Sequence, residues 1–104
     1  MTDEEIKLLA EIGNLIRQTV KEFDMHPYDI NDGMCFEFVD ELMVQAEQNG
    51  FDLERQNSDD TGFPCHGWVY CPTLYLHFDA EAVVGVIDWK DLPIFIRYRV
   101  LTPP

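Results

Sequence analysis

A cysteine stands where the sequence changes from a turn-rich segment to a helical pattern. This residue, Cys35, follows Gly33 and Met34. The positive end of a helix dipole lowers the pKa of a thiol at the helix N-terminus, which favours the reactive thiolate. Gly33 lets the backbone approach closely, and the Cys35 amide could donate to an oxyanion. We therefore consider Cys35 a candidate nucleophile, although a lone cysteine is more often a buried core residue.

A histidine and an aspartate fall on two strands expected later in the chain. His66 begins the expected strand 66–71, and Asp79, 13 positions further on, ends the expected strand 73–79. Neighbouring antiparallel strands could bring the two side chains together. The imidazole would then take the thiol proton while the carboxylate orients the ring. Taken singly, His66 fits an edge strand and Asp79 fits a turn at a strand end.

The order of these motifs resembles that of a known family. Cys35 after a glycine, the run His66-Gly67-Trp68 and then Asp79 resemble the Cys–His–Asp core of the papain-like and transglutaminase-like cysteine hydrolases. Gly67 stands where this family usually has alanine or another side chain. The stretch 75–93 is also similar to small phage and bacterial proteins of this fold, in which a strand ending Asp-Ala-Glu precedes a Gly-Val, Asp-Trp and Leu-Pro turn.

The resemblance covers roughly residues 31–96 and implies thiol-based hydrolysis or acyl transfer on an amide or ester. It implies that Cys35 attacks, that His66 moves the proton and that Asp79 orients the ring. No upstream glutamine is evident as an oxyanion donor, and Asn31 is the substitute that could reach back toward the thiol. We expect this chemistry to need no cofactor and no metal.

Two alternatives remain open around His66. Cys65, His66, Cys71 and His77 are four zinc-ligand types within a short stretch, so a structural zinc site is one alternative. Their spacing matches no usual zinc motif. His77 is also an alternative catalytic base, but it precedes Asp79 by only two residues and fits the arrangement less well than His66.

Two helices are expected before the strands. Thr2 and Glu5 form a capping-box pattern and apolar residues recur at helical spacing, which predicts a helix over residues 3–23. Residues 24–33 are rich in turn formers, with Asn31 or Asp32 as the N-cap of a second helix. The second helix should end at Asn49-Gly50. Its expected buried stripe is Phe36, Val39, Leu42, Met43 and Ala46.

The second half of the chain has the pattern of an antiparallel sheet. Residues 52–64 are polar and are expected to form an exposed loop. Two strands follow, and Pro72 between them indicates either the turn of a hairpin or an edge position. Apolar residues alternate over 94–100, which predicts a final strand. The predicted fold is therefore α+β, with two N-terminal helices packed on a small antiparallel sheet in a single domain over residues 1–104. The resemblance makes this a minimal papain-like core.

Charge dominates the composition. Twenty Asp and Glu against seven Lys and Arg give a formal net charge of −13, which works against binding to nucleic acids and to anionic membranes. The same charge should attract a basic peptide or protein, as substrate or as partner. It also favours a rival hypothesis: a non-enzymatic acidic protein of phage type that mimics phosphates and inhibits a basic, nucleic-acid-binding host complex.

The cysteines and apolar runs bear on the compartment. Cys35, Cys65 and Cys71 are odd in number, and no stretch near Met1 resembles a secretion signal. We therefore expect reduced thiols and a cytoplasmic protein. The longest apolar runs fall far short of the roughly 20 residues that a bilayer span needs.

Overall fold

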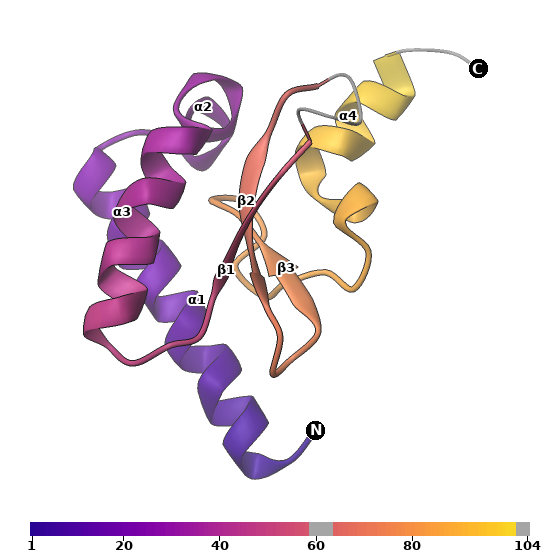
Figure 1. Cartoon of the computed structure of the whole chain (residues 1–104). Coiled ribbons are helices and arrows are strands. Elements are labelled where there is room, and N and C mark those ends of the chain that lie inside the picture. The colour runs from indigo at the N-terminus through magenta and orange to yellow at the C-terminus, as the bar shows by residue number, and fades with distance from the viewer. Residues whose placement is uncertain (59–63, 102–104) are drawn as a thin grey trace.

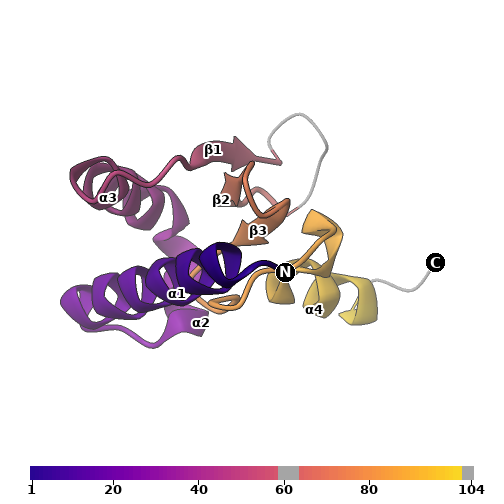
Figure 2. The ribbon, with the colours of Figure 1, turned by 90° about the horizontal axis from the view of Figure 1, so that it is seen from below.

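The computed structural model describes residues 1–58 and 64–101, which form an α+β fold (Figure 1). The elements in chain order are α1 (Asp3–Phe23), α2 (Pro27–Gly33), α3 (Cys35–Gln48), β1 (Glu54–Asn57), β2 (Gly67–Cys71), β3 (Leu76–Phe78), the 3-10 helix η2 (Trp89–Asp91) and α4 (Pro93–Leu101). Figures 1 and 2 show α1 to α3 gathered on one side of the sheet and α4 on the other. The predicted fold class is confirmed.

The first helix has the bounds that the sequence predicts. The Glu5 amide donates to Thr2 Oγ1 at 3.1 Å, and the Thr2 amide donates to Glu5 Oε1 at 2.9 Å, so the capping box is complete. Helix α1 packs on α3, which buries the predicted residues Val39, Leu42 and Ala46.

The aromatic residue that α3 buries differs from the prediction. Phe38 is 1% exposed and lies in the core, whereas Phe36 is 39% exposed. The Phe36 ring instead covers Gly67 at the start of β2, where a Cβ would meet its Cδ1 at 3.0 Å. The expected buried stripe was therefore wrong at Phe36, because the ring of this residue contacts Gly67 of the sheet.

The segment expected to be a turn, residues 24–33, contains helix α2. His26 caps it, because its Nδ1 accepts the Tyr28 amide at 3.1 Å, and Pro27 occupies the first helical turn, where it is well tolerated. Helix α3 then starts after Met34 without a side-chain cap. Asn31 and Asp32 are not its N-cap, so the prediction of that cap was wrong. The first amides of α3 therefore remain available to other acceptors.

The sheet has three antiparallel strands in the order β1-β2-β3. Strands β2 and β3 form the predicted hairpin, with Val69 opposite Phe78. Strand β1 lies within residues 52–64, which were expected to be a loop, and pairs along β2 with Asn57 opposite Gly67. Its sequence, Glu-Arg-Gln-Asn, lacks apolar residues because it forms an exposed edge. Residues 59–63 of that expected loop lie outside the described residues.

The expected final strand is a helix, α4. The Phe95 and Ile96 amides both donate to the Leu92 carbonyl, at 3.0 and 3.2 Å, which is a helical pattern. The predicted strand was wrong. Ile94 and Phe95 are both buried and Ile96 is exposed, so burial along this segment does not alternate as it would in a strand. The free edge of β3 is also occupied, since the amides and carbonyls of His77 and Val86 hydrogen bond reciprocally at 2.8 and 2.9 Å.

Two hydrophobic clusters hold these layers together. Alternation along β2 directs Val69 into the larger cluster, with α1 and α3, and Trp68 into the smaller one, with Phe95 of α4. Both faces of β2 are thus covered near its start, where His66 lies. Among the described residues, no helix combines the length and the apolar character needed to traverse a bilayer.

Candidate active site

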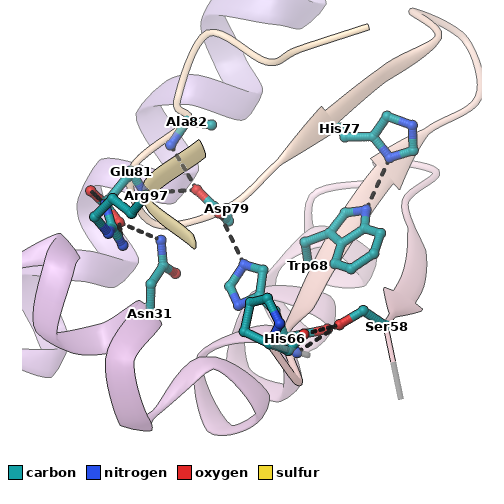
Figure 3. Close-up of polar contacts among 10 residues, drawn as sticks. Asn31, Ser58, His66, Trp68, His77, Asp79, Glu81, Ala82 and Arg97 are labelled. Carbon is teal, nitrogen blue, oxygen red and sulfur yellow. Dashed lines mark hydrogen bonds and ion pairs between the residues drawn. The ribbon is translucent and has the colours of Figure 1, made fainter. Parts of the chain in front are cut away.

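Cys35, His66 and Asp79 come together at one buried place. Cys35 is the first residue of α3, His66 immediately precedes β2, and Asp79 immediately follows β3. His66 Nε2 lies 3.0 Å from Asp79 Oδ2 (Figure 3). The three residues are 7%, 0% and 2% exposed, respectively. The helix and the hairpin therefore bring the predicted nucleophile, base and acid side by side.

Asp79 is held in one orientation by the backbone that follows it. Its Oδ1 accepts the Glu81 amide at 3.0 Å and the Ala82 amide at 2.8 Å. An aspartate that bonds amides two and three residues ahead forms a local turn of its own. This leaves Oδ2 for His66, so the carboxylate can fix the orientation of the imidazole and keep the proton on Nε2.

Ser58 holds the backbone of His66. The His66 amide donates to Ser58 Oγ at 2.9 Å, and the Ser58 amide donates to the His66 carbonyl at 3.0 Å. Ser58 Oγ in turn donates to the Pro64 carbonyl at 2.6 Å. Ser58 is buried, and sequence reasoning missed it because it fell within an expected exposed loop.

The second ring nitrogen of His66, Nδ1, is buried and makes no regular hydrogen bond to nitrogen, oxygen or sulfur among the described residues. Within the described residues, His66 Nδ1 is the one buried side-chain nitrogen or oxygen without a regular hydrogen-bond partner. The Cys35 thiol and this imidazole shift each other's pKa through hydrogen bonding and charge. The ring therefore binds the Asp79 carboxylate and is electrostatically coupled to the Cys35 thiol.

The electrostatics of the pair favour charge separation. Burial raises the pKa of Cys35, but hydrogen bonding with His66, the Gly67 and Phe36 amides and the charge of His66 outweigh it, so the pKa is lowered. Burial lowers the pKa of His66, but hydrogen bonds to Asp79 and Cys35 and their charges outweigh it, so this pKa is raised. Opposite shifts in two partners favour a thiolate beside an imidazolium.

The glycine after His66 has a steric reason. A Cβ at position 67 would lie 3.0 and 3.1 Å from two ring carbons of Phe36. This strand and the first turn of α3 therefore approach closely, and the Gly67 amide helps to lower the pKa of Cys35. The glycine that departs from the family pattern is therefore accounted for by the position of Phe36.

The alternative base, His77, lies elsewhere in the site region. Its Nδ1 accepts the indole N–H of Trp68 at 3.0 Å, and burial lowers its pKa (Figure 3). The Trp68 ring stacks on His66, with ring centroids 5.9 Å apart. Phe95 of α4 meets the His66 ring edge-on at 5.7 Å. Aromatic rings therefore surround the base, and His77 bonds to one of them.

Asn31 has its amide engaged away from the thiol. Its Nδ2 donates to Glu81 Oε1 at 2.9 Å, and Arg97 binds the same carboxylate (Figure 3). The structure thus joins Asn31 to Glu81, and the oxyanion role suggested for it stays a prediction. A donor nearer the thiol is available at the uncapped start of α3, as the Phe36 amide shows.

The candidate zinc ligands are spread over different environments. Cys65 is exposed, whereas Cys71 is buried in the larger cluster. Over residues 1–58 and 64–101, no three His, Cys, Asp or Glu side chains are grouped so that they could hold a metal ion. His66 and His77 have the partners described above.

Comparison of the chain with protein-family models, with curated proteins and with solved structures gives no match. The papain-like resemblance therefore stays a prediction. What bears on function is the geometry of Cys35, His66 and Asp79, together with the lowered pKa of Cys35 and the raised pKa of His66.

Proposed function

We propose that the chain is a thiol hydrolase or acyltransferase, on a papain-like or transglutaminase-like scaffold, that acts on an amide or ester. One observation carries the proposal: a single buried imidazole is bonded to Asp79 at 3.0 Å and lowers the pKa of the Cys35 thiol, while its other ring nitrogen is buried without a regular partner. A buried, unpartnered ring nitrogen is costly in a purely structural histidine. The cost is understandable if that nitrogen exchanges a proton with the thiol.

In the proposed first half-reaction, the Cys35 thiolate attacks the carbonyl carbon of the substrate. The C–S bond forms as the carbonyl electrons move to oxygen, and amides at the start of α3 stabilise that oxyanion. His66 then gives its proton to the leaving amine or alkoxide as the bond to carbon breaks. The product is a thioester on Cys35.

In the second half-reaction, neutral His66 takes a proton from the incoming nucleophile. Attack by water gives a carboxylic acid, and attack by an amine gives acyl transfer; both regenerate the Cys35 thiolate and the His66 imidazolium. Asp79 stabilises the imidazolium and keeps the ring oriented throughout, while remaining ionised. The two outcomes differ only in the second nucleophile.

The charge of the chain bears on the substrate. A formal net charge of −13 favours basic or neutral substrates over anionic ones. A Lys- or Arg-rich peptide or protein is therefore the proposed substrate class, and the cytoplasm is the proposed compartment.

A trapping experiment tests the proposed chemistry. Incubation with p-nitrophenyl acetate should release nitrophenolate in a burst and leave one acetyl group on Cys35, detected by peptide mass spectrometry. Cys35→Ser and His66→Gln should abolish the burst, and Cys65→Ser, which removes an exposed thiol, should not. Acetylation of Cys65 in preference to Cys35 would contradict the proposal.

The burial of the three residues and the charge of −13 favour a second candidate. In it, the chain is an acidic phage-type protein that binds and inhibits a basic nucleic-acid-binding complex by imitating phosphates. Neutralising exposed acids of α3, as in Glu37→Gln with Glu41→Gln, should then weaken binding to a Lys-rich peptide, while Cys35→Ser leaves it unchanged. A biological activity lost in Cys35→Ser but kept in the acid variants favours the enzyme.

A further inference from the structure

We propose that Glu81 and Arg97 are positioning residues that fix Asp79, and through it the His66 imidazole, against Cys35. The inference rests on the proposed function and adds residues that the three-residue site does not include. It assigns a role to helix α4, which supplies Arg97 and also contacts His66 through Phe95.

The contact between Arg97 and Glu81 has the geometry of a strong ion pair. Arg97 Nη1 donates to Glu81 Oε2 at 2.9 Å and Nη2 donates to Oε1 at 2.8 Å (Figure 3). Asn31 adds a third bond to the same carboxylate. A bidentate guanidinium–carboxylate pair fixes both direction and distance. Three bonds from α2 and α4 therefore hold the Glu81 side chain in one place.

The backbone of Glu81 is part of the site. Its amide donates to Asp79 Oδ1 at 3.0 Å, and the Ala82 amide donates to the same oxygen. When the side chain of Glu81 is held, its amide is held as well, and so is the carboxylate that it binds. Asp79 Oδ2 then stays 3.0 Å from His66 Nε2. The chain of contacts from Arg97 to the imidazole is continuous.

Arg97 is itself fixed by a second contact. Its guanidinium lies over the Tyr28 ring of α2, 4.5 Å from the centroid. The Arg97 and Glu81 side chains are 30% and 17% exposed. A partly buried, bidentate pair of this kind constrains geometry more than a surface pair does. The ion pair thus joins α2 and α4 to the segment after β3, whose amides bind Asp79.

Helix α4 offers a matched control in Arg99. Arg99 pairs with Asp91 at 3.3 Å, and both side chains are 57% exposed. Arg99→Met removes the same charge from the same helix as Arg97→Met, without touching the segment that holds Asp79. Any effect shared by the two variants therefore reflects charge or helix stability rather than positioning.

The test compares Arg97→Met with Glu81→Gln in the full chain. The readout is the pH dependence of iodoacetamide alkylation at Cys35, resolved by peptide mass spectrometry. The two substitutions change the local charge in opposite directions, so a field effect alone would raise the Cys35 pKa in Arg97→Met and lower it in Glu81→Gln. Loss of positioning weakens the interaction of His66 with Cys35 in both variants, so both substitutions should raise the Cys35 pKa. We expect alkylation near neutral pH to slow about threefold or more in each, equivalent to about half a pKa unit.

Specific results would overturn the inference. Opposite shifts in the two variants would show a field effect, and an equal shift in Arg99→Met would show a general effect of α4. If Arg97→Met does not fold, Arg97→Lys replaces it, because lysine keeps the charge but not the bidentate contact. A Lys variant with wild-type pH dependence would then overturn the inference.

A parallel measurement on His66→Gln separates this inference from the proposed function. If His66→Gln slows Cys35 alkylation while Glu81→Gln and Arg97→Met do not, the positioning role fails and the proposed function stands. If His66→Gln itself leaves Cys35 unchanged, the proposed function fails.

Discussion

At the scale of single residues, the site depends on how the pKa of the Cys35 thiol is lowered although the thiol is buried. Burial alone makes Cys35 a weaker acid, and the imidazole, two backbone amides and the charge of His66 reverse that effect. These groups come from two parts of the chain, since His66 and Gly67 are adjacent at the start of β2 and Phe36 belongs to α3. Cys65, by contrast, is exposed.

We predict that Cys35 is alkylated with a pH midpoint below that of Cys65, even though it is the more buried thiol. Its lowered pKa keeps the thiolate populated to lower pH, because half of the thiolate remains at the pKa itself. His66→Gln should raise the midpoint and slow alkylation at neutral pH about tenfold, which corresponds to one pKa unit. Asp79→Asn should act in the same direction but more weakly.

Rates measured on each cysteine-containing peptide across pH give this comparison directly. Cys65 is the internal control, because neither substitution should change its midpoint. A Cys35 midpoint equal to that of Cys65 would argue against an activated thiol.

Ser58 is a residue whose role is structural and local to the base. We predict that Ser58→Ala lowers the free energy of unfolding by about 1–3 kcal/mol, because the His66 amide and the Pro64 carbonyl lose a buried hydrogen-bond partner. Urea unfolding followed by fluorescence measures the difference. Thr73→Ala, at an exposed position of the hairpin turn, is the control and should change stability little. Equal stability of the Ser58 variant and wild type would contradict the prediction.

At the scale of elements, the segment after β3 packs closely enough to require glycine. Gly85 has φ of +80°, and a Cβ there would lie 3.0 Å from Leu76 Cβ and from two ring carbons of Phe78. Both the backbone conformation and the space exclude a side chain. This segment runs from Asp79 to the bridge at Val86, so its packing helps to place the acid of the site.

Gly85→Ala should therefore destabilise the fold by about 2–4 kcal/mol, the sum of a left-handed backbone penalty and an overpacking penalty. Gly50→Ala is a matched control, because Gly50 has φ of +75° but no atom within 4 Å of an added Cβ. It should cost only about 1–2 kcal/mol. Thermal or urea unfolding of the two variants isolates the steric part, and equal costs would show that space at Gly85 is not limiting.

Elements with strong local signals could be predicted from the sequence. The capping box of Thr2 and Glu5 and a long apolar period define α1, and Pro72 marks the hairpin turn. The alternation over 94–100 was misleading because isoleucine and aromatic residues favour strands locally, while packing against Trp68 selects a helix. Strand β1 has no apolar signal at all, since it lies at the exposed edge of the sheet beside β2.

The residues of the candidate site also fall into those that the sequence could predict and those that it could not. Cys35, His66 and Asp79 could be selected by residue type and order, because nucleophile, base and acid have characteristic chemistry. Ser58, Glu81 and Arg97 could not, because their importance comes from partners that the fold supplies. Asn31, for example, binds Glu81 50 positions later in the sequence. No pattern near Asn31 indicates that contact.

At the scale of the whole molecule, the net charge bears on the proposed recognition of a basic partner. A formal net charge of −13 on 104 residues creates a long-range field, which salt screens over about 8–10 Å at physiological ionic strength. We predict that affinity for a Lys-rich peptide falls steeply as sodium chloride is raised from low to physiological concentration. Fluorescence anisotropy of a labelled peptide measures this, with a Glu-rich peptide as the control. Affinity that is independent of salt would show that apolar contact carries recognition instead.

The separation of the site residues along the chain has a consequence for folding. His66 and Asp79 are joined by a short hairpin, whereas Cys35 lies far upstream and reaches them only when α3 docks on β2. Local contacts form faster than distant ones during folding. The base and its acid would thus pair early, and the sulfur would acquire its enhanced acidity only at the final docking step. During refolding, the reactivity of the Cys35 thiol would therefore report when the tertiary structure is complete. No added label on the aromatic residues would be needed.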